Sequence, residues 1–75
     1  MEKLLKILKS IKEDVNFMEC ENLIDGGYLD SFDILQLITA ISEEYEINIP
    51  ATEILPSNFN SMKNIKMMID RLTNE

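Results

Sequence analysis

Residues 31–45, which read SFDILQLITAISEEY, form the stretch of sequence that decides the fold. Apolar side chains recur in it at steps of three or four positions: Phe32, Leu35, Ile38, Ile41 and Tyr45. This spacing predicts an amphipathic helix over 31–45 that places these side chains in the core, with Leu37 widening the stripe. Gly26 and Gly27 break the chain before this helix, and Ser31 stands where an N-cap residue belongs.

Two further stretches show the same periodicity. The first carries Leu4, Leu8, Ile11 and Val15, and the second carries Met62, Ile65, Met68, Ile69 and Leu72. They predict helices over about 2–14 and 61–72. A short helix is expected near 52–58, between Pro50 and the cap signal that ends at Ser61. The chain is therefore predicted to be all-α, with three main helices and one short helix.

The predicted loop over 16–30 is long for a chain of 75 residues. Its apolar residues are expected to hold it to the core: Phe17, Met18, Leu23, Ile24 and Leu29. A long loop in a small domain is usually functional or packed by its own side chains. The methionines at 62, 67 and 68 are expected to fill the core, with a cavity for variable guests as the alternative.

The chain is acidic, with 14 Asp and Glu residues against 7 Lys and Arg and a net charge of −7. All the basic residues lie near the ends, so the 11 carboxylates from Glu13 to Glu53 have few cationic neighbours in sequence. This balance argues against a nucleic acid or an anionic membrane surface as partner. A solvated acidic surface and a steering field for a basic partner both remain open.

Several kinds of chemistry are excluded by composition. The chain has no histidine, which removes Ser-His-Asp and Cys-His pairs and every His-containing metal site. Residues 25–33 do not fit an EF-hand loop, because both registers place apolar residues at ligand positions. Cys20 lies between two glutamates, which disfavour a reactive thiolate. No catalytic residue and no metal ligand is therefore predicted, and residues 1–75 are expected to form one domain that is not an enzyme.

Compartment and assembly are also expectations at this stage. A single cysteine suits a reducing compartment, and the charged N-terminal residues do not resemble a signal peptide. No apolar run approaches the ~20 residues that cross a bilayer. We expect a cytoplasmic monomer.

Ser31 is the candidate functional residue. It follows a long loop and a Gly-Gly bend, and it opens a helix whose N–H groups suit a phosphate bonded to its Oγ. Asp30 precedes it and the apolar Phe32 follows. The alternative is that Ser31 is an N-cap and nothing more. No base stands nearby in sequence, so another enzyme would have to modify it.

These residues resemble a known family. The segment Leu29–Phe32, opening an amphipathic helix in an acidic chain of this length, resembles the phosphopantetheine site of acyl carrier proteins, whose core motif is Asp-Ser-Leu. Phe32 replaces the leucine and keeps its apolar character. The segments 43–50 and 58–61 resemble the exit of the family's second helix and the entry to its last helix. The segment Gly27–Phe32 also resembles the D-alanyl carrier branch.

The resemblance implies a four-helix acyl-carrier-type bundle with 4′-phosphopantetheine, donated by coenzyme A, attached to Ser31. The arm carries an acyl or aminoacyl group as a thioester. Asp30 is implied to help orient the phosphopantetheinyl transferase or its metal. The implied docking residues, which basic patches of loading ligases, transferases and synthases would contact, are Asp33, Ile34, Gln36, Glu43 and Glu44.

The cargo remains open between two alternatives. The main interpretation is an acyl carrier that serves a specialised biosynthetic pathway. The alternative is a D-alanyl or peptidyl-type carrier, which an adenylating ligase would load. A different class, an unmodified acidic interaction module, would explain the charge but not the position of the Asp30-Ser31 pair.

Overall fold

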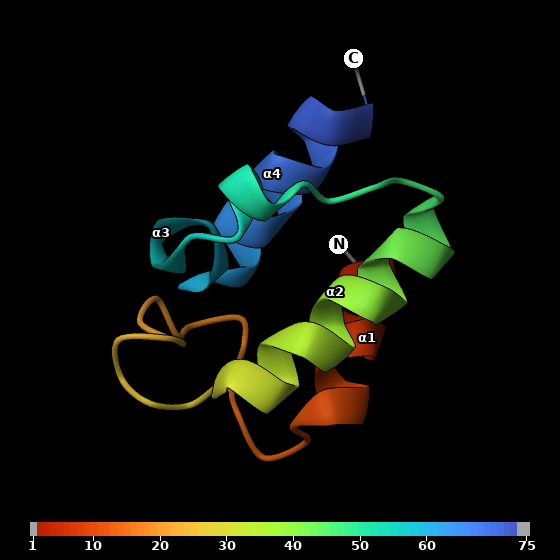
Figure 1. Cartoon of the computed structure of the whole chain (residues 1–75). Helices are drawn as coiled ribbons and strands as arrows, with labels where there is room; N and C mark the ends of the chain where they lie inside the picture. The colour runs from red at the N-terminus through yellow and green to blue at the C-terminus, as the bar shows by residue number, and fades with distance from the viewer. Residues whose placement is uncertain (1, 74–75) are drawn as a thin grey trace.

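The chain folds into four α-helices and one 3-10 turn, in a computed structural model that describes residues 2–73. The elements in order are α1 (Glu2–Ile11), α2 (Ser31–Tyr45), η1 (Ala51–Glu53), α3 (Pro56–Phe59) and α4 (Met62–Thr73). No strand occurs in this part of the chain. Helix α1 packs along α2 and also contacts α4, while α3 packs against α4 (Figure 1). The predicted all-α bundle is confirmed.

Two predicted helix boundaries were wrong. Helix α1 ends at Ile11 instead of near residue 14. The chain turns there, and the Lys9 ammonium donates to the Val15 carbonyl at 2.8 Å. This turn brings Val15 and Phe17 into the core. The short helix near 52–58 is split into η1 and α3. Pro56 has no N–H to continue the hydrogen bonds of a helix, so it begins a new one.

The core lies where α1, α2 and α4 meet, and the long loop and α3 add side chains to it. The side chains that are almost completely buried are Leu4, Leu8, Phe17, Leu23, Leu37, Ile41, Phe59, Ile65, Met68 and Ile69. Burial of one such side chain contributes about 1.5–3 kcal/mol. No helix among the described residues is long and apolar enough to cross a lipid bilayer.

Some residues predicted to lie in the core are exposed. In the loop, Leu23 and Leu29 are buried as expected, but Met18 is 68% exposed. In α4, Met68 is buried but Met67 lies at the surface. The loop itself occupies the end of the molecule where α2 begins (Figure 1). It therefore forms the immediate surroundings of Ser31.

The buried face of α2 also differs from the predicted one. Leu37 and Ile41 face the core as expected, but Phe32 and Leu35 are 68% and 64% exposed. The first half of this helix is apolar on nearly all sides, so its periodicity is compatible with more than one buried face. Packing against α1 selects the face of Leu37 and Ile41 and leaves Phe32 and Leu35 in solvent.

Candidate functional site

A capping box closes the N-terminus of α2. The Asp33 N–H donates to Asp30 Oδ1 at 2.9 Å, and the Asp30 N–H donates to Asp33 Oδ2 at 3.2 Å. Asp30 is therefore the N-cap, and the prediction that Ser31 holds this position was wrong. Asp30 has extended backbone angles and its carboxylate reaches the third residue of the helix, which satisfies two N–H groups reciprocally.

Ser31 is consequently the first residue of α2, and it is exposed. Among residues 2–73, no hydrogen bond engages its hydroxyl. The positive end of the helix dipole and the first backbone N–H groups lie at this position, which favours an anionic substituent on Oγ. The arrangement suits a serine that receives a phosphate-linked group.

Asp33 is only 6% exposed, which differs from its expected place on a docking surface. Its Oδ2 lies 3.5 Å from the Lys12 ammonium, which reaches over from the residue after α1. Together with the capping box, this contact joins the end of α1 to the start of α2. The Asp33 carboxylate therefore makes its contacts within the protein.

Asp30 is exposed beside Ser31, and its protonation is controlled by the cap. The hydrogen bond from the Asp33 N–H holds the pKa of the Asp30 carboxyl below its ordinary value of 3.8, and the nearby Lys12 charge lowers the pKa further. The Asp30 carboxylate is therefore ionised at neutral pH, and it lies next to Ser31, the first residue of α2.

The Gly-Gly bend before Ser31 has a specific backbone geometry. Gly27 has φ of +78°, a backbone angle that residues with a side chain rarely adopt. A Cβ on Gly26 would lie 2.7 Å from the Asn22 carbonyl oxygen. The Leu29 N–H then donates to the Leu23 carbonyl at 2.9 Å, which turns the chain back towards α2. The loop is therefore an ordered turn that ends at the cap.

An apolar groove of about 150 Å³ lies between α2, the loop and the segment around α3. Six residues line it: Ile24, Ile34, Ile54, Leu55, Pro56 and Phe59. Ile34 follows Ser31 by three positions and so lies beside it on the helix surface. Its side chain is half-buried and faces this groove, so the apolar docking residue expected at position 34 lies on the wall of the groove.

The outer face of α2 combines apolar and acidic side chains. Gln36, Glu43 and Glu44 are exposed, as their predicted docking role requires. Phe32 and Leu35, which the sequence pattern placed in the core, lie on this surface close to Ser31. The unusually apolar first half of the helix was the signal that could have identified them.

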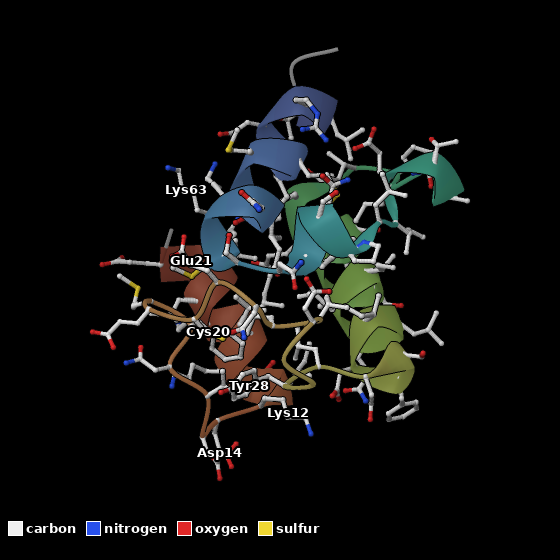
Figure 2. The ribbon with its side chains drawn as sticks, turned by 90° about the vertical axis from the view of Figure 1, so that its left-hand side faces the viewer. Lys12, Asp14, Cys20, Glu21, Tyr28 and Lys63 are labelled. Carbon is white, nitrogen blue, oxygen red and sulfur yellow. The ribbon has the colours of Figure 1, made fainter. Side chains whose placement is uncertain are left out.

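The loop also carries Cys20, the single cysteine of the chain. Figure 2 shows Cys20 and Glu21 between Lys63 of α4 and the lower group of Tyr28, Lys12 and Asp14. The Cys20 Sγ donates to Asn22 Oδ1 at 3.3 Å, and the thiol is partly buried. Cys20 therefore has a local structural contact within the loop.

Few of the central carboxylates have a cationic partner, as the charge pattern suggested. The exceptions among the described residues are Asp33, which pairs with Lys12, and Glu53, which pairs with Arg71. The third ion pair joins Lys66 and Asp70 within α4. The exposed carboxylates of α2 and of the loop before it therefore make the surface of these two segments strongly negative.

An exposed serine that opens a capped helix, beside an apolar groove, is the arrangement expected of a carrier protein. Comparison with curated proteins supports this class. The chain is 34% identical to the D-alanyl carrier protein of Streptococcus mutans serotype c over 71 residues, covering 93% of this chain and 90% of that protein. It is 27% identical over 63 residues to the D-alanyl carrier proteins of Lactobacillus helveticus and Lactobacillus acidophilus, covering 84% of this chain and 80% of each relative.

The chain therefore belongs to the family of stand-alone carrier proteins that these D-alanyl carrier proteins represent. No family model matches the sequence, and no solved structure matches it. The resemblance noted from the Asp30-Ser31 segment is thus supported along most of the chain and not only at the motif.

Proposed function

We propose that this chain carries D-alanine as a thioester on a 4′-phosphopantetheine arm attached to Ser31 Oγ. The observation that supports the attachment point is the exposed Ser31, whose hydroxyl is free of the helix cap because Asp30 provides that cap. The relatives named D-alanyl carrier proteins support the choice of D-alanine within the broader class of acyl and aminoacyl cargoes.

The residues around Ser31 fit a phosphodiester at this position. The N-terminus of α2 offers a favourable dipole, and the Asp30 carboxylate accepts the Asp33 N–H instead of pointing freely at the attachment point. The arm would supply the thiol that forms the thioester. When the arm is attached, the Ser31 hydroxyl proton passes to a base of the transferase and the Ser31 Oγ–phosphorus bond forms. The pyrophosphate bond of coenzyme A breaks, and 3′,5′-ADP leaves.

The size of the apolar groove supports a short cargo. About 150 Å³ is the volume of a cavity that holds a benzene-sized guest, and it lies below the ~300 Å³ at which pockets begin to enclose larger ligands. A long fatty acyl chain would extend beyond Ile54 and Leu55 into solvent. An aminoacyl group, together with the nearest atoms of the arm, matches the size of the groove better than a long fatty acyl chain does.

The outer face of α2 is the proposed docking surface. Phe32 and Leu35 would contact an apolar patch, while Gln36, Glu43 and Glu44 would face basic side chains of the partner. The partners are a phosphopantetheinyl transferase and an adenylating ligase that loads the thiol. The chain itself would act as a cytoplasmic monomer that catalyses no reaction. The transferase and the ligase would supply the general bases for attaching the arm and for loading its thiol.

The test of attachment is intact mass after incubation with coenzyme A, magnesium and a promiscuous phosphopantetheinyl transferase. Wild type should gain one phosphopantetheinyl group, and Ser31→Ala should gain none. Ser57→Ala is the matched control, because Ser57 is also exposed in the first turn of a helix, and it should be modified as wild type is. No gain in wild type would instead favour an unmodified acidic interaction module.

The test of cargo uses the modified chain. ATP, D-alanine and a D-alanyl-carrier ligase should add one alanyl group to wild type, in a form that hydroxylamine releases. A fatty acyl-carrier ligase with a long-chain fatty acid is the comparison. Better loading by that enzyme would overturn the D-alanyl proposal and leave the broader acyl carrier.

A further inference from the structure

The side chain of Asn60, between α3 and α4, is bound to a loop segment more than 30 positions away in sequence. Asn60 Oδ1 accepts the N–H groups of Ile24 and Asp25, each at 3.0 Å, and Asn60 Nδ2 donates to Asp25 Oδ2 at 3.2 Å. The Asn60 carbonyl also accepts the Leu23 N–H at 2.8 Å. We call these four hydrogen bonds the Asn60 latch.

The donors and acceptors of the latch determine which way the amide points. Two backbone N–H groups require an acceptor, and the Asp25 carboxylate requires a donor. The reverse orientation would set the amide NH₂ of Asn60 against both N–H groups and its oxygen against the carboxylate. The amide of Asn60 satisfies all three side-chain contacts together with aspartate at position 25.

The latch joins the two walls of the apolar groove. Ile24 belongs to the loop wall, and its own N–H is bound by Asn60. Phe59, the residue before Asn60, belongs to the other wall together with Pro56. The separation of the two walls, and so the volume of the groove, therefore depends on these hydrogen bonds as well as on packing.

If the latch opens, Gly26 and Gly27 can take up the change in backbone angles, because glycine tolerates more backbone conformations than other residues. Gly26 and Gly27 follow the latched segment directly and lead to the cap of α2. The capping box and the Lys12–Asp33 contact hold the other end of the loop independently of Asn60. Opening the latch should thus move the Ile24 wall away from α3 while Ser31 stays at the start of α2.

We propose that Asn60 is a positioning residue that limits the cargo of this carrier by holding its groove narrow. The cargo consequence rests on the proposed function, whereas the effect on groove size does not. With the latch closed, the groove of about 150 Å³ shelters a short group and leaves the rest of a longer chain in solvent. With the latch opened, it accepts longer apolar chains from the arm on Ser31.

The variant that opens the latch is Asn60→Asp, which keeps an acceptor for both N–H groups but sets a second carboxylate against Asp25. The exchanged pair Asp25→Asn with Asn60→Asp should close the latch again, because the amide at position 25 then donates to the carboxylate at position 60. Asn48→Asp, an exposed residue outside the latch, controls for the added charge. Circular dichroism establishes that each variant is folded.

The first measurement uses the unmodified chain and so does not depend on attachment at Ser31. Methyl signals of Ile34 and Ile54 are followed by NMR during titration with benzyl alcohol and with 1-naphthol. Both probes should shift these signals in Asn60→Asp, and only the smaller probe should do so in wild type and the exchanged pair. Amide exchange at Ile24 and Asp25 should be at least about threefold faster in Asn60→Asp, because repulsion between the carboxylates at positions 25 and 60 moves the acceptor away from both N–H groups. The same probe selectivity in all variants would overturn the proposal.

The second measurement compares chains that carry an acetyl or an octanoyl thioester. The phosphopantetheinyl transferase moves the acyl-phosphopantetheinyl group from the corresponding acyl-coenzyme A to Ser31 Oγ, and 3′,5′-ADP leaves. Hydroxylamine should cleave both at similar rates in wild type. In Asn60→Asp, the octanoyl thioester should be cleaved at least about threefold more slowly than the acetyl thioester, and the exchanged pair should reverse this protection. Equal rates in Asn60→Asp would refute the role in cargo length. Failure to load wild type would refute the proposed function and leave the first measurement to decide on the latch.

Discussion

The Asp33 carboxylate should stabilise the fold, although the sequence assigned it to a docking surface. It is 6% exposed, accepts the Asp30 N–H at 3.2 Å and lies 3.5 Å from the Lys12 ammonium. The hydrogen bond should contribute about 0.5–1.5 kcal/mol, and the ion pair, whose lysine is partly solvated, up to about 1 kcal/mol. Asp33→Ala should therefore lower the free energy of unfolding by about 1–2 kcal/mol, which corresponds to a decrease in Tm of roughly 4–16 °C.

The assay is thermal and urea unfolding of wild type, Asp33→Ala, Lys12→Met and the double variant. The double-mutant cycle isolates the ion pair, and its coupling energy should not exceed about 1 kcal/mol. Glu43→Ala is the matched control, because Glu43 is an exposed carboxylate of the same helix and its loss should change stability by less than about 0.5 kcal/mol. An unchanged Tm in Asp33→Ala, or an equal decrease in Glu43→Ala, would refute the structural role of Asp33. Such a result would favour its interpretation as a docking residue.

Four further predictions concern pH, docking, backbone strain and salt. The Asp33 N–H lowers the pKa of Asp30, so the ionised carboxylate stabilises the folded state above pH 3.8; Asp30→Asn should lower the Tm at pH 7, and the difference from wild type should disappear as the pH falls below 3.8. Phe32→Ser with Leu35→Ser should raise the KM of the transferase by about tenfold and leave the Tm nearly unchanged, whereas a large loss of stability would place these side chains in the core. Glu46 ends α2 with φ of 54°, so Glu46→Gly should raise the free energy of unfolding by about 0.5–1 kcal/mol in urea titrations, and a decrease would contradict the strain argument. Magnesium and sodium chloride should raise the Tm of wild type by screening repulsion among the acidic side chains, and a Tm that is indifferent to both would contradict this account.

Local sequence patterns were sufficient for the two longest helices and for choosing Ser31 as the candidate residue. The periodicity of 31–45 and 61–72 predicted α2 and α4 within one residue at each end, since a continuous apolar stripe and a polar cap depend on neighbours three or four positions away. The Asp30-Ser31 pair at a helix start was equally recognisable, because residue type and adjacency define it. The acidic surface followed directly from composition.

The tertiary structure decided which residues share a face or a contact. The apolar first half of α2 allowed two buried faces, and only packing against α1 buried Leu37 and exposed Phe32. The choice of Asp30 over Ser31 as cap depended on backbone angles set by the folded loop. The contact of Asn60 with Ile24 spans 36 positions. No periodic pattern encodes such a contact, because it forms only after hydrophobic packing has brought the loop and α3 together.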